Sequence, residues 1–375
     1  MKRIVLVGGG SGGHFYPLIA TAERLNDMKS QGESLELYYL GPETYNQESL
    51  IANNITFIKI PTGKQRKYFS FLNFLDLFKV FFGFIIAIGK LYKIYPDVVF
   101  SKGGYTSVPV VLAAWVLRIP IVIHESDTKP GSANKLGSKF ARYIAVGFDD
   151  AAKYFPEKKV ALTGIPLRKV FHTLVPKADA ISKLGLPSTM PLLLVTGGSI
   201  GSQRINSLIL ESLDELLPNF VILHQTGEQN EESVRQTAAR LLQDPELLSR
   251  YFVKGTLSGT EMHLAQSAAT LIISRAGTGT IFEIAQKGKP AIVIPIPEDV
   301  SHDQRTNAYA FARSGAASVL EEANLTDGLL TAEITRIMTD PAVYETMSAS
   351  ARQFAGTDAA KTIAETLTGV TREHA

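Results

Sequence analysis

The stretch that decides the fold runs from Leu271 to Ala308 and reads LIISRAGTGTIFEIAQKGKPAIVIPIPEDVSHDQRTNA. Its first residues, Leu271 to Ile273, form a short apolar run that predicts a buried strand, and the glycine-broken RAGTGT then leads into an amphipathic segment, Ile281 to Gln286. Lys287 to Pro290 end this predicted helix, and AIVIPIP predicts the next buried strand. Strand, loop, helix and strand in this order are typical of a parallel α/β sheet.

Polar side chains gather where these strands end, and ligands of parallel sheets bind at that edge, where helix N-termini attract anions such as phosphate. Glu283 has two interpretations. Thr280 and Glu283 fit a capping box, whereas a carboxylate beside a phosphate site could instead accept hydrogen bonds from vicinal sugar hydroxyls. Arg275 and Arg305 flank the site. Each could pair with phosphate, or could lie on the surface and contribute nothing measurable to stability.

The composition limits the class of protein. At 375 residues the chain is too long for one ordinary core, so two α/β domains are expected. The absence of cysteine excludes disulfides and thiolate sites and agrees with a reducing compartment. A net charge of +2 is too close to neutral to predict nucleic acid as a partner, and the first residues do not resemble a signal peptide.

A second strand, glycine loop and helix open the chain. The β-branched run Ile4 to Val7 is followed by Gly8 to His14, and Pro17 to Leu25 has a helical apolar pattern. The glycines at the first, third and sixth positions of the loop match the dinucleotide fingerprint, which is a weak signal alone. The acid that should end the next strand, Leu35 to Leu40, is missing, and this disfavours a dinucleotide oxidoreductase.

Strands and helices continue to alternate along the chain. Ser101 to Tyr105 follow one predicted strand, and His124 to Asp127 follow the next. Thr163 to Arg168 resemble a domain crossing, after which the pattern restarts with a strand at Leu192 to Val195 and a glycine loop at Thr196 to Ser202. Two such halves predict a cleft between facing domains, where ligands usually bind.

Residues 69 to 88 break this pattern, because they form an apolar segment of about the length that spans a bilayer. Asn73, Asp76 and Lys79 argue against spanning, since a charge at mid-helix costs about 2.5 to 3.5 kcal/mol. A helix lying on anionic lipid is favoured instead, because basic residues outnumber acidic ones by eight to two between positions 59 and 102. A buried helix beside a solvated basic loop is the alternative.

Two sets of residues define this membrane hypothesis. The basic residues are Lys59, Lys64, Arg66, Lys67, Lys79, Lys90, Lys93 and Lys102. The aromatic side chains expected to insert are Phe69, Phe71, Phe74, Phe78, Phe81 and Phe82.

Several spaced motifs, taken in order over nearly the whole chain, resemble the MurG-type glycosyltransferases, which convert lipid I to lipid II in peptidoglycan synthesis. These motifs are Gly9 to Pro17, Gly103 to Tyr105, His124-Glu125 with Gly131, Asn134 and Lys135, Gly197 to Ser199 with Gly201 and Asn206, His224 to Gly227, Arg275 to Glu283, and Gln304 with Asn307. The resemblance implies a GT-B fold, in which two Rossmann-like, doubly wound parallel-sheet domains face a cleft. We expect an acceptor- and membrane-binding domain over residues 1–164, a donor-binding domain over 165–345, and a C-terminal helix over 346–375 that packs on the first domain.

The implied activity is an inverting transfer of N-acetylglucosamine from UDP-GlcNAc to the 4-hydroxyl of lipid I, with no cofactor and no obligatory divalent metal. The implied location is peripheral, on the cytoplasmic face of the plasma membrane, with an anionic lipid surface and cell-wall synthesis proteins as partners. A related lipid glycosyltransferase acting on diacylglycerol stays open, as does a noncatalytic nucleotide-sugar-binding subunit.

The resemblance also implies roles for individual residues. Glu283 would hold the uridine ribose, and Gln304 would contact the donor sugar. The other donor-binding residues would be Ser11, Gly12, Gly13, Asp127, Arg168, Ser199, Arg275, Thr278, Gly279 and Thr280. The acceptor would meet His14, Gly103, Gly104, Tyr105 and Asn134.

The transfer needs a base for the acceptor hydroxyl and stabilisation of the leaving diphosphate, which helix N-termini and Arg168 could supply. His14 is the first candidate for the base, followed by Asp127 and Glu125, and the alternative for His14 is a helix-capping role. The sequence departs from the family pattern in two places. Glu125-Ser126-Asp127 stands where Glu-Gln-Asn is usual, and Gly279 replaces a larger apolar residue.

Overall fold

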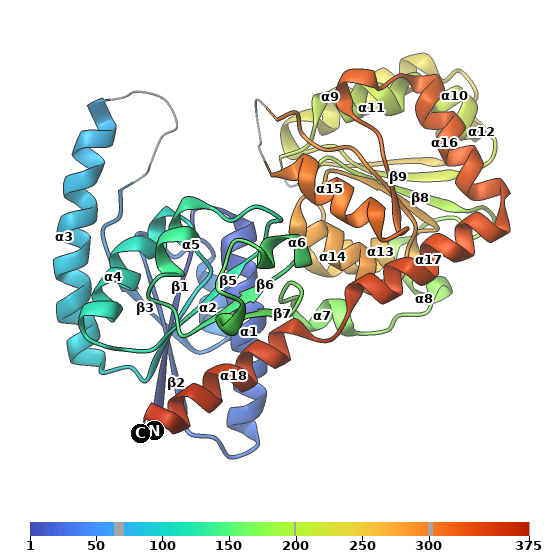
Figure 1. Cartoon of the computed structure of the whole chain (residues 1–375). Helices are drawn as coiled ribbons and strands as arrows, with labels where there is room; N and C mark the ends of the chain where they lie inside the picture. Colours follow the sequence, from blue (N-terminus) through green and yellow to red (C-terminus); the bar gives the residue numbers. More distant parts are fainter. Residues whose placement is uncertain (64–70, 199, 299–302, 375) are drawn as a thin grey trace. The chain divides into compact units, whose positions relative to one another are not determined.

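Two parallel β-sheets divide the chain into two compact units (Figure 1). The computed structural model describes residues 1–63, 71–198, 200–298 and 303–374. Unit 1 comprises Met1–Lys169 together with Thr357–Ala375, and unit 2 comprises Val170–Gly356. The predicted class, two doubly wound parallel α/β domains, is confirmed.

Unit 1 contains a seven-stranded parallel sheet in the order β3-β2-β1-β4-β5-β6-β7. Its strands are β1 (Lys2–Val7), β2 (Leu35–Gly41), β3 (Ile55–Lys59), β4 (Val98–Ser101), β5 (Ile121–Glu125), β6 (Tyr143–Val146) and β7 (Val160–Leu162). Its helices are α1 (Gly12–Ser30), α2 (Gln47–Ala52), α3 (Phe71–Ile94), α4 (Val108–Val116), α5 (Ser132–Gly137), α6 (Asp149–Ala152) and α18 (Ala359–His374).

Side chains of successive strand residues fill two cores on opposite faces of this sheet, as the period of a strand requires. Ile4 and Leu6 of β1 belong to a core that α1 and α18 cover. Val5 and Val7 belong to the other core, to which α3 and α4 contribute. Both faces of the sheet are therefore buried at β1, which explains why Ile4 to Val7 form a continuous apolar run.

Unit 2 contains a six-stranded parallel sheet in the order β10-β9-β8-β11-β12-β13. Its strands are β8 (Leu192–Thr196), β9 (Val221–Gln225), β10 (Tyr251–Lys254), β11 (Leu271–Ser274), β12 (Ala291–Val293) and β13 (Ala317–Val319). Its helices are α8 (Lys177–Leu184), α9 (Gln203–Glu211), α10 (Leu213–Leu216), α11 (Glu231–Leu241), α12 (Pro245–Leu248), α13 (Gly259–Ala268), α14 (Thr278–Gln286), α15 (Gln304–Arg313), α16 (Asp327–Thr339) and α17 (Pro341–Ala355), and the short α7 (Lys169–His172) spans the boundary between the units.

The strand order reverses at one place in each sheet. In unit 1 the first strand pairs with β2 on one side and with β4 on the other. In unit 2 the strand β8 likewise pairs with β9 and β11. Such reversals are where open α/β sheets bind ligands. The strands β1, β4, β8 and β11 lead into the loops that the sequence singled out.

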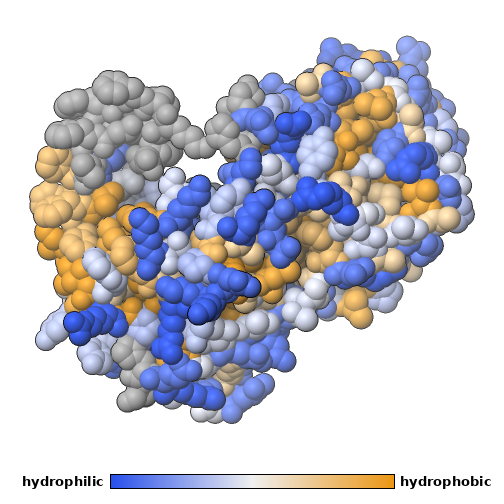
Figure 2. Space-filling view, in the orientation of Figure 1, coloured by the Kyte–Doolittle hydropathy of each residue, from blue (hydrophilic) through white to orange (hydrophobic). Residues whose placement is uncertain are grey.

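The helix α3 contains the apolar segment that interrupts the sequence pattern. Ala87, Leu91 and Ile94 are buried in the core of unit 1, whereas Phe81 and Phe82 are more than half exposed. Figure 2 shows a hydrophobic surface over this helix. Within the described residues, no helix is both long and apolar enough to cross a bilayer.

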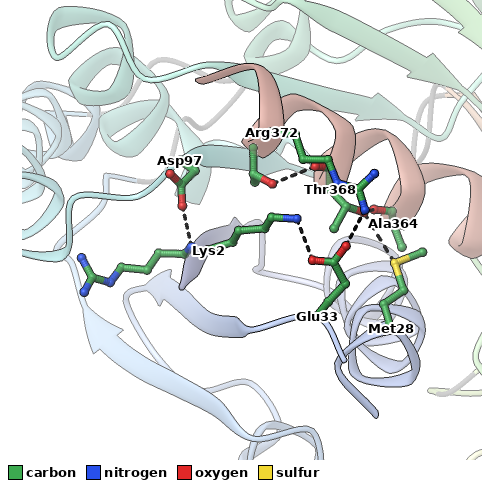
Figure 3. A network of polar contacts seen from close by, with 9 residues as sticks. Lys2, Met28, Glu33, Asp97, Ala364, Thr368 and Arg372 are labelled. Atoms are coloured by element: carbon green, nitrogen blue, oxygen red, sulfur yellow. Dashed lines mark hydrogen bonds and ion pairs between the residues drawn. The ribbon is translucent and has the colours of Figure 1, made fainter. Parts of the chain in front are cut away.

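The C-terminal helix α18 packs against α1 and completes unit 1. Ile363, Leu367 and Val370 are fully buried in the same core as the first strand. A polar network fixes the end of this helix: Glu33 accepts hydrogen bonds from Lys2 Nζ at 2.7 Å and from Arg372 at 2.5 Å (Figure 3). Residues far apart in the sequence thus close one core.

We predict that Leu367→Ala lowers the free energy of unfolding by about 2 to 5 kcal/mol, because it leaves a cavity between α18 and α1. Urea unfolding and hydrogen exchange of the β1 amides would measure the loss. Glu365→Ala, an exposed change on the same helix, should stay within about 0.5 kcal/mol of the parent. Unchanged β1 exchange in Leu367→Ala would mean that α18 does not support this core.

Candidate active site

The first glycine loop ends in a helix that carries His14 in its first turn. The helix α1 begins at Gly12, with Ser11 as its N-cap, so it starts five residues before the apolar pattern that predicted it. The Ser11 hydroxyl lies 3.0 Å from His14 Nδ1, so this contact uses one ring nitrogen and not Nε2. The N-cap position is occupied by Ser11, and the His14 ring contacts the hydroxyl of that residue from the first turn of the helix.

The backbone of the neighbouring loop approaches His14 closely. A Cβ on Gly104 would lie 2.9 Å from His14 Cδ2, and one on Gly103 would lie 2.6 Å from Asn134 Oδ1. Both glycines have positive φ angles, +78° and +83°, that side chains rarely allow. The structure therefore brings together three of the predicted acceptor residues, Gly103, Gly104 and Asn134, with His14, and Tyr105 follows directly at the start of a 3-10 turn.

Glu125 organises the loop after β5. Its carboxylate accepts hydrogen bonds from Asn134 Nδ2 at 3.0 Å, from the Gly131 amide at 3.1 Å and from the Asp127 amide at 3.0 Å. The side chain is only 4% exposed. This arrangement suits a residue that holds the loop, whereas the Asp127 side chain is more accessible.

Lys102 is the functional candidate that the sequence analysis missed. It was counted with the basic surface residues, but it is 2% exposed and its Nζ bonds to the Ser126 hydroxyl, so that assignment is wrong. Burial lowers the pKa of Lys102 to about 8, while the charges of Glu125 and Asp127 act in the opposite direction. Burial, together with the charge of Lys102, lowers the pKa of His14 to about 4, so this imidazole is neutral at pH 7.

Position alone could have drawn attention to this lysine. Lys102 directly follows a buried strand and precedes two glycines, and ligand-binding residues often occupy that place. His124, at the end of β5, is also fully buried, and its Nε2 lies 2.8 Å from the Gly164 carbonyl oxygen, as expected of a core histidine.

The space beside the first glycine loop is filled by Tyr39 of β2. Its hydroxyl donates a hydrogen bond to the Gly8 carbonyl at 2.7 Å, and a Cβ on Gly9 would lie 2.7 Å from the same hydroxyl. No acid occupies the end of this strand, since β2 ends at Gly41. The local geometry thus agrees with the argument against a dinucleotide site.

In unit 2 the helix α14 presents its N-terminus at the end of β11. Gly277 is the N-cap and makes no side-chain cap, so the capping box proposed for Thr280 and Glu283 is wrong. Thr278, Gly279 and Thr280 form the partly exposed first turn, whose N–H groups have no partner within the helix. A Cβ on Gly279 would meet nothing within 4 Å, so the glycine here does not reflect a steric limit.

Glu283 follows one turn later on the same helix. Its carboxylate accepts a hydrogen bond from Gln266 Nε2 at 3.1 Å, and the side chain is partly exposed. The nearby Ser274 hydroxyl is fully buried with no hydrogen-bond partner among the described residues. This edge of the sheet therefore combines a carboxylate with free helix N–H groups.

The predicted arginines have partners within the protein. Arg275 donates to the Ile294 and Pro295 carbonyls, both at 3.2 Å, and to the Ser202 hydroxyl at 2.6 Å, and it pairs with Glu322 at 2.5 Å. Arg275, which follows β11, thus links the N-cap of α9 at Ser202 to the residues that follow β12. Arg305 pairs with Glu298 and Glu321 on the surface.

The remaining donor candidates are placed as follows. Arg168 belongs to unit 1, where its guanidinium stacks over the Tyr16 ring at 4.7 Å. Gln304 begins α15, and its Oε1 accepts a hydrogen bond from the Ile296 amide at 3.3 Å. Ser199 lies outside the described residues.

Comparison with known proteins decides the family. The glycosyltransferase family 28 N-terminal domain matches residues 4–146, and the family 28 C-terminal domain matches residues 192–363. A Treponema denticola "UDP-N-acetylglucosamine--N-acetylmuramyl-(pentapeptide) pyrophosphoryl-undecaprenol N-acetylglucosamine transferase" is 39% identical over 344 residues, which cover 85% of this chain and 84% of that protein. A Bacillus anthracis protein of the same name, numbered 2, is 35% identical over 375 residues, covering 97% and 98%. The chain belongs to glycosyltransferase family 28.

Solved structures agree with membership of family 28. The crystal structure of Acinetobacter baumannii MurG is 25% identical, with a TM-score of 0.78, and the match covers 98% of this chain and 100% of that one. A UDP-GlcNAc 2-epimerase from Neisseria meningitidis, at 16% identity and a TM-score of 0.70 over 98% and 100% of the two chains, shares the fold. The chain has the GT-B fold of family 28 glycosyltransferases.

We predict that Gly104→Ala displaces the His14 ring and costs about 1 to 3 kcal/mol of stability, because the new methyl group meets the imidazole and the backbone becomes strained. Urea unfolding and the NMR resonances of His14 would report both effects. Gly369→Ala, where a Cβ meets nothing within 4 Å, is the matched control and should not destabilise the protein. Native stability with an unmoved His14 resonance in Gly104→Ala would refute this packing.

Proposed function

We propose that this chain transfers N-acetylglucosamine from UDP-GlcNAc to the 4-hydroxyl of the lipid-linked N-acetylmuramyl acceptor lipid I, which forms lipid II. The observation that carries this proposal is the similarity, at 35% to 39% identity over most of the chain, to proteins named for that transfer. The reaction inverts the anomeric carbon, and no cofactor or obligatory divalent metal takes part in it.

Unit 2 binds the donor in this proposal. The N–H groups at the start of α14 and its helix dipole attract the diphosphate, together with Thr278 and Thr280. Glu283 accepts hydrogen bonds from the ribose hydroxyls, and Gln304 contacts the sugar. As the glycosidic bond breaks, the growing negative charge on the diphosphate meets these fixed donors, which lowers the barrier.

Unit 1 binds the acceptor and supplies the base. His14 is our first choice, because its Nδ1 is held by Ser11 and its neutral ring can accept the hydroxyl proton at Nε2. Asp127 is the second candidate, since its carboxylate is accessible. The three hydrogen bonds that Glu125 accepts favour a supporting role for that residue.

A transfer assay tests the proposal directly. Radiolabelled UDP-GlcNAc is incubated with lipid I, with diacylglycerol or with no acceptor, and the lipid products are extracted. We expect label only in the lipid I sample, and an added chelator should leave the rate unchanged. Label in diacylglycerol alone would favour the related lipid glycosyltransferase, and UDP-GlcNAc binding without any transfer would favour a noncatalytic subunit.

We predict that Glu283→Ala raises the Michaelis constant for the donor much more than it lowers turnover, because ribose contacts stabilise the ground state and the transition state alike. Calorimetry should find weaker UDP binding in parallel. Glu246→Ala, an exposed carboxylate change in the same unit, serves as the control and should leave both constants unchanged. Undiminished UDP affinity in a folded Glu283→Ala protein would remove this residue from the donor site.

We also propose that α3 docks unit 1 on the membrane, peripherally and on the cytoplasmic face. The exposed side chains Phe78, Phe81, Phe82, Ile85 and Ile86 provide the apolar contact. Exposed cations on and near this helix supply the basic charge, and these are Lys59, Lys79, Lys90 and Lys93. Asp76 is buried and paired with Lys79 at 2.9 Å, so it adds little exposed negative charge.

The other residues of this hypothesis lie outside the described part of the chain. They are Lys64, Arg66, Lys67, Phe69 and the side chains of Phe71 and Phe74.

We predict that the double variant Phe78→Ser, Phe81→Ser binds vesicles more weakly than the parent, because apolar area that enters the bilayer is lost. Each basic residue near anionic lipid contributes about 1 kcal/mol, and salt should weaken that part alone. Co-sedimentation with neutral and anionic vesicles at low and high salt measures both. Leu241→Ser, similarly exposed in unit 2, is the control. Equal sedimentation of the double variant and the parent would assign membrane attachment to another part of the chain.

A further inference from the structure

A buried ammonium group joins two of the strand ends at the switch point of unit 1. Lys102 follows β4, and its Nζ bonds to the hydroxyl of Ser126, which follows β5; both side chains are buried. The Lys102 amide also donates to the Val7 carbonyl at 2.8 Å, and a Cβ on Gly8 would lie 2.8 Å from Lys102 Cβ. Lys102 thus lies between the first glycine loop and the loop that carries Glu125 and Asp127.

We propose that Lys102 is a positioning residue for glycosyl transfer, whose buried ammonium fixes the Ser126–Asp127 turn and places a positive charge beside His14. This inference rests on the proposed function, because it assigns Lys102 to the reaction in which His14 takes the acceptor proton. A lysine so completely removed from water is costly unless its charge is used or compensated.

The charges around this lysine agree with such a role. The carboxylates of Glu125 and Asp127 act on it from the β5 loop and favour its protonated form. The charge of Lys102 in turn disfavours protonation of His14 on α1 and of His124 on β5, in addition to the larger effect of burial. The ring of His14 has the Ser11 hydroxyl and the Gly104 backbone as its other close neighbours. Lys102 therefore lies between two carboxylates that favour its charge and two imidazoles whose protonation its charge disfavours.

The test compares Lys102→Met with the parent, using NMR titration of the histidine side chains in the ligand-free protein and the pH profile of kcat/KM. Burial, the larger cause of the low His14 pKa, remains in the variant, so this pKa should rise from about 4 but stay below 6.5. A base must be neutral to accept a proton, so the acidic limb of kcat/KM should move upward by the same amount. Lys139→Met, an exposed change in the same unit, should move neither.

Two further variants separate the parts of the proposal. Ser126→Ala keeps the charge but removes the hydroxyl partner, so the His14 pKa should stay at about 4 while kcat/KM falls about tenfold. Because loss of Lys102 removes a positive charge beside two carboxylates, Lys102→Met combined with Asp127→Asn provides a variant with one fewer negative charge at the same place. This double variant should show the same upward shift of His14.

The outcomes are distinct. An unchanged His14 pKa in folded Lys102→Met or in the double variant would overturn the proposal, whatever the activity. A raised His14 pKa with an unmoved kcat/KM profile would also overturn it, since the charge would then have no part in the reaction. Failure of the parent enzyme to transfer sugar to lipid I would instead refute the proposed function, and the NMR titration would still report the effect of Lys102.

Discussion

The structure of unit 1 depends on the lack of space for side chains where β1 and β4 end. Gly8 and Gly104 lie so near Lys102 and His14 that a single added carbon would collide with them. The same constraint occurs in unit 2, where a Cβ on Gly201 would lie 1.9 Å from the Thr226 carbonyl oxygen. This close backbone contact lets neighbouring strand-end loops present their polar groups at a common edge, and buried parallel strands on both sides hold that edge rigid.

The strands and the class of fold could be predicted from the sequence because the signals are local. A short apolar run followed by a glycine loop identifies a strand end, whether at Val7, Thr196 or Ser274. The order of the strands is not a local property, so the sequence did not indicate that β1 lies beside β4. The four loops at the switch points were recognised separately, and only the folded sheets place them in pairs.

Burial and hydrogen bonding set the limits of the site prediction. A count of charges along the chain treats Lys102 and Lys90 alike, although one is buried in the site and the other is on the surface. Spacing likewise allowed a capping box at Thr280, but α14 begins two residues earlier and removes that possibility. Ser126 and Asp127 depart from the family pattern, and both act on the buried ammonium of Lys102. Ser126 accepts its hydrogen bond, and the negative charge of Asp127 favours its protonated form.

The C-terminal helix also has a consequence for the order in which the protein folds during synthesis. Unit 2 is one continuous stretch, Val170–Gly356, whereas unit 1 needs both the first 169 residues and the last 19. Because synthesis proceeds from the N-terminus, α18 is made only after all of unit 2, so the core that begins with β1 stays incomplete while unit 2 is synthesised. Unit 2 can therefore fold while the apolar residues of unit 1 that α18 covers are still exposed, and exposed apolar surface of this kind favours aggregation.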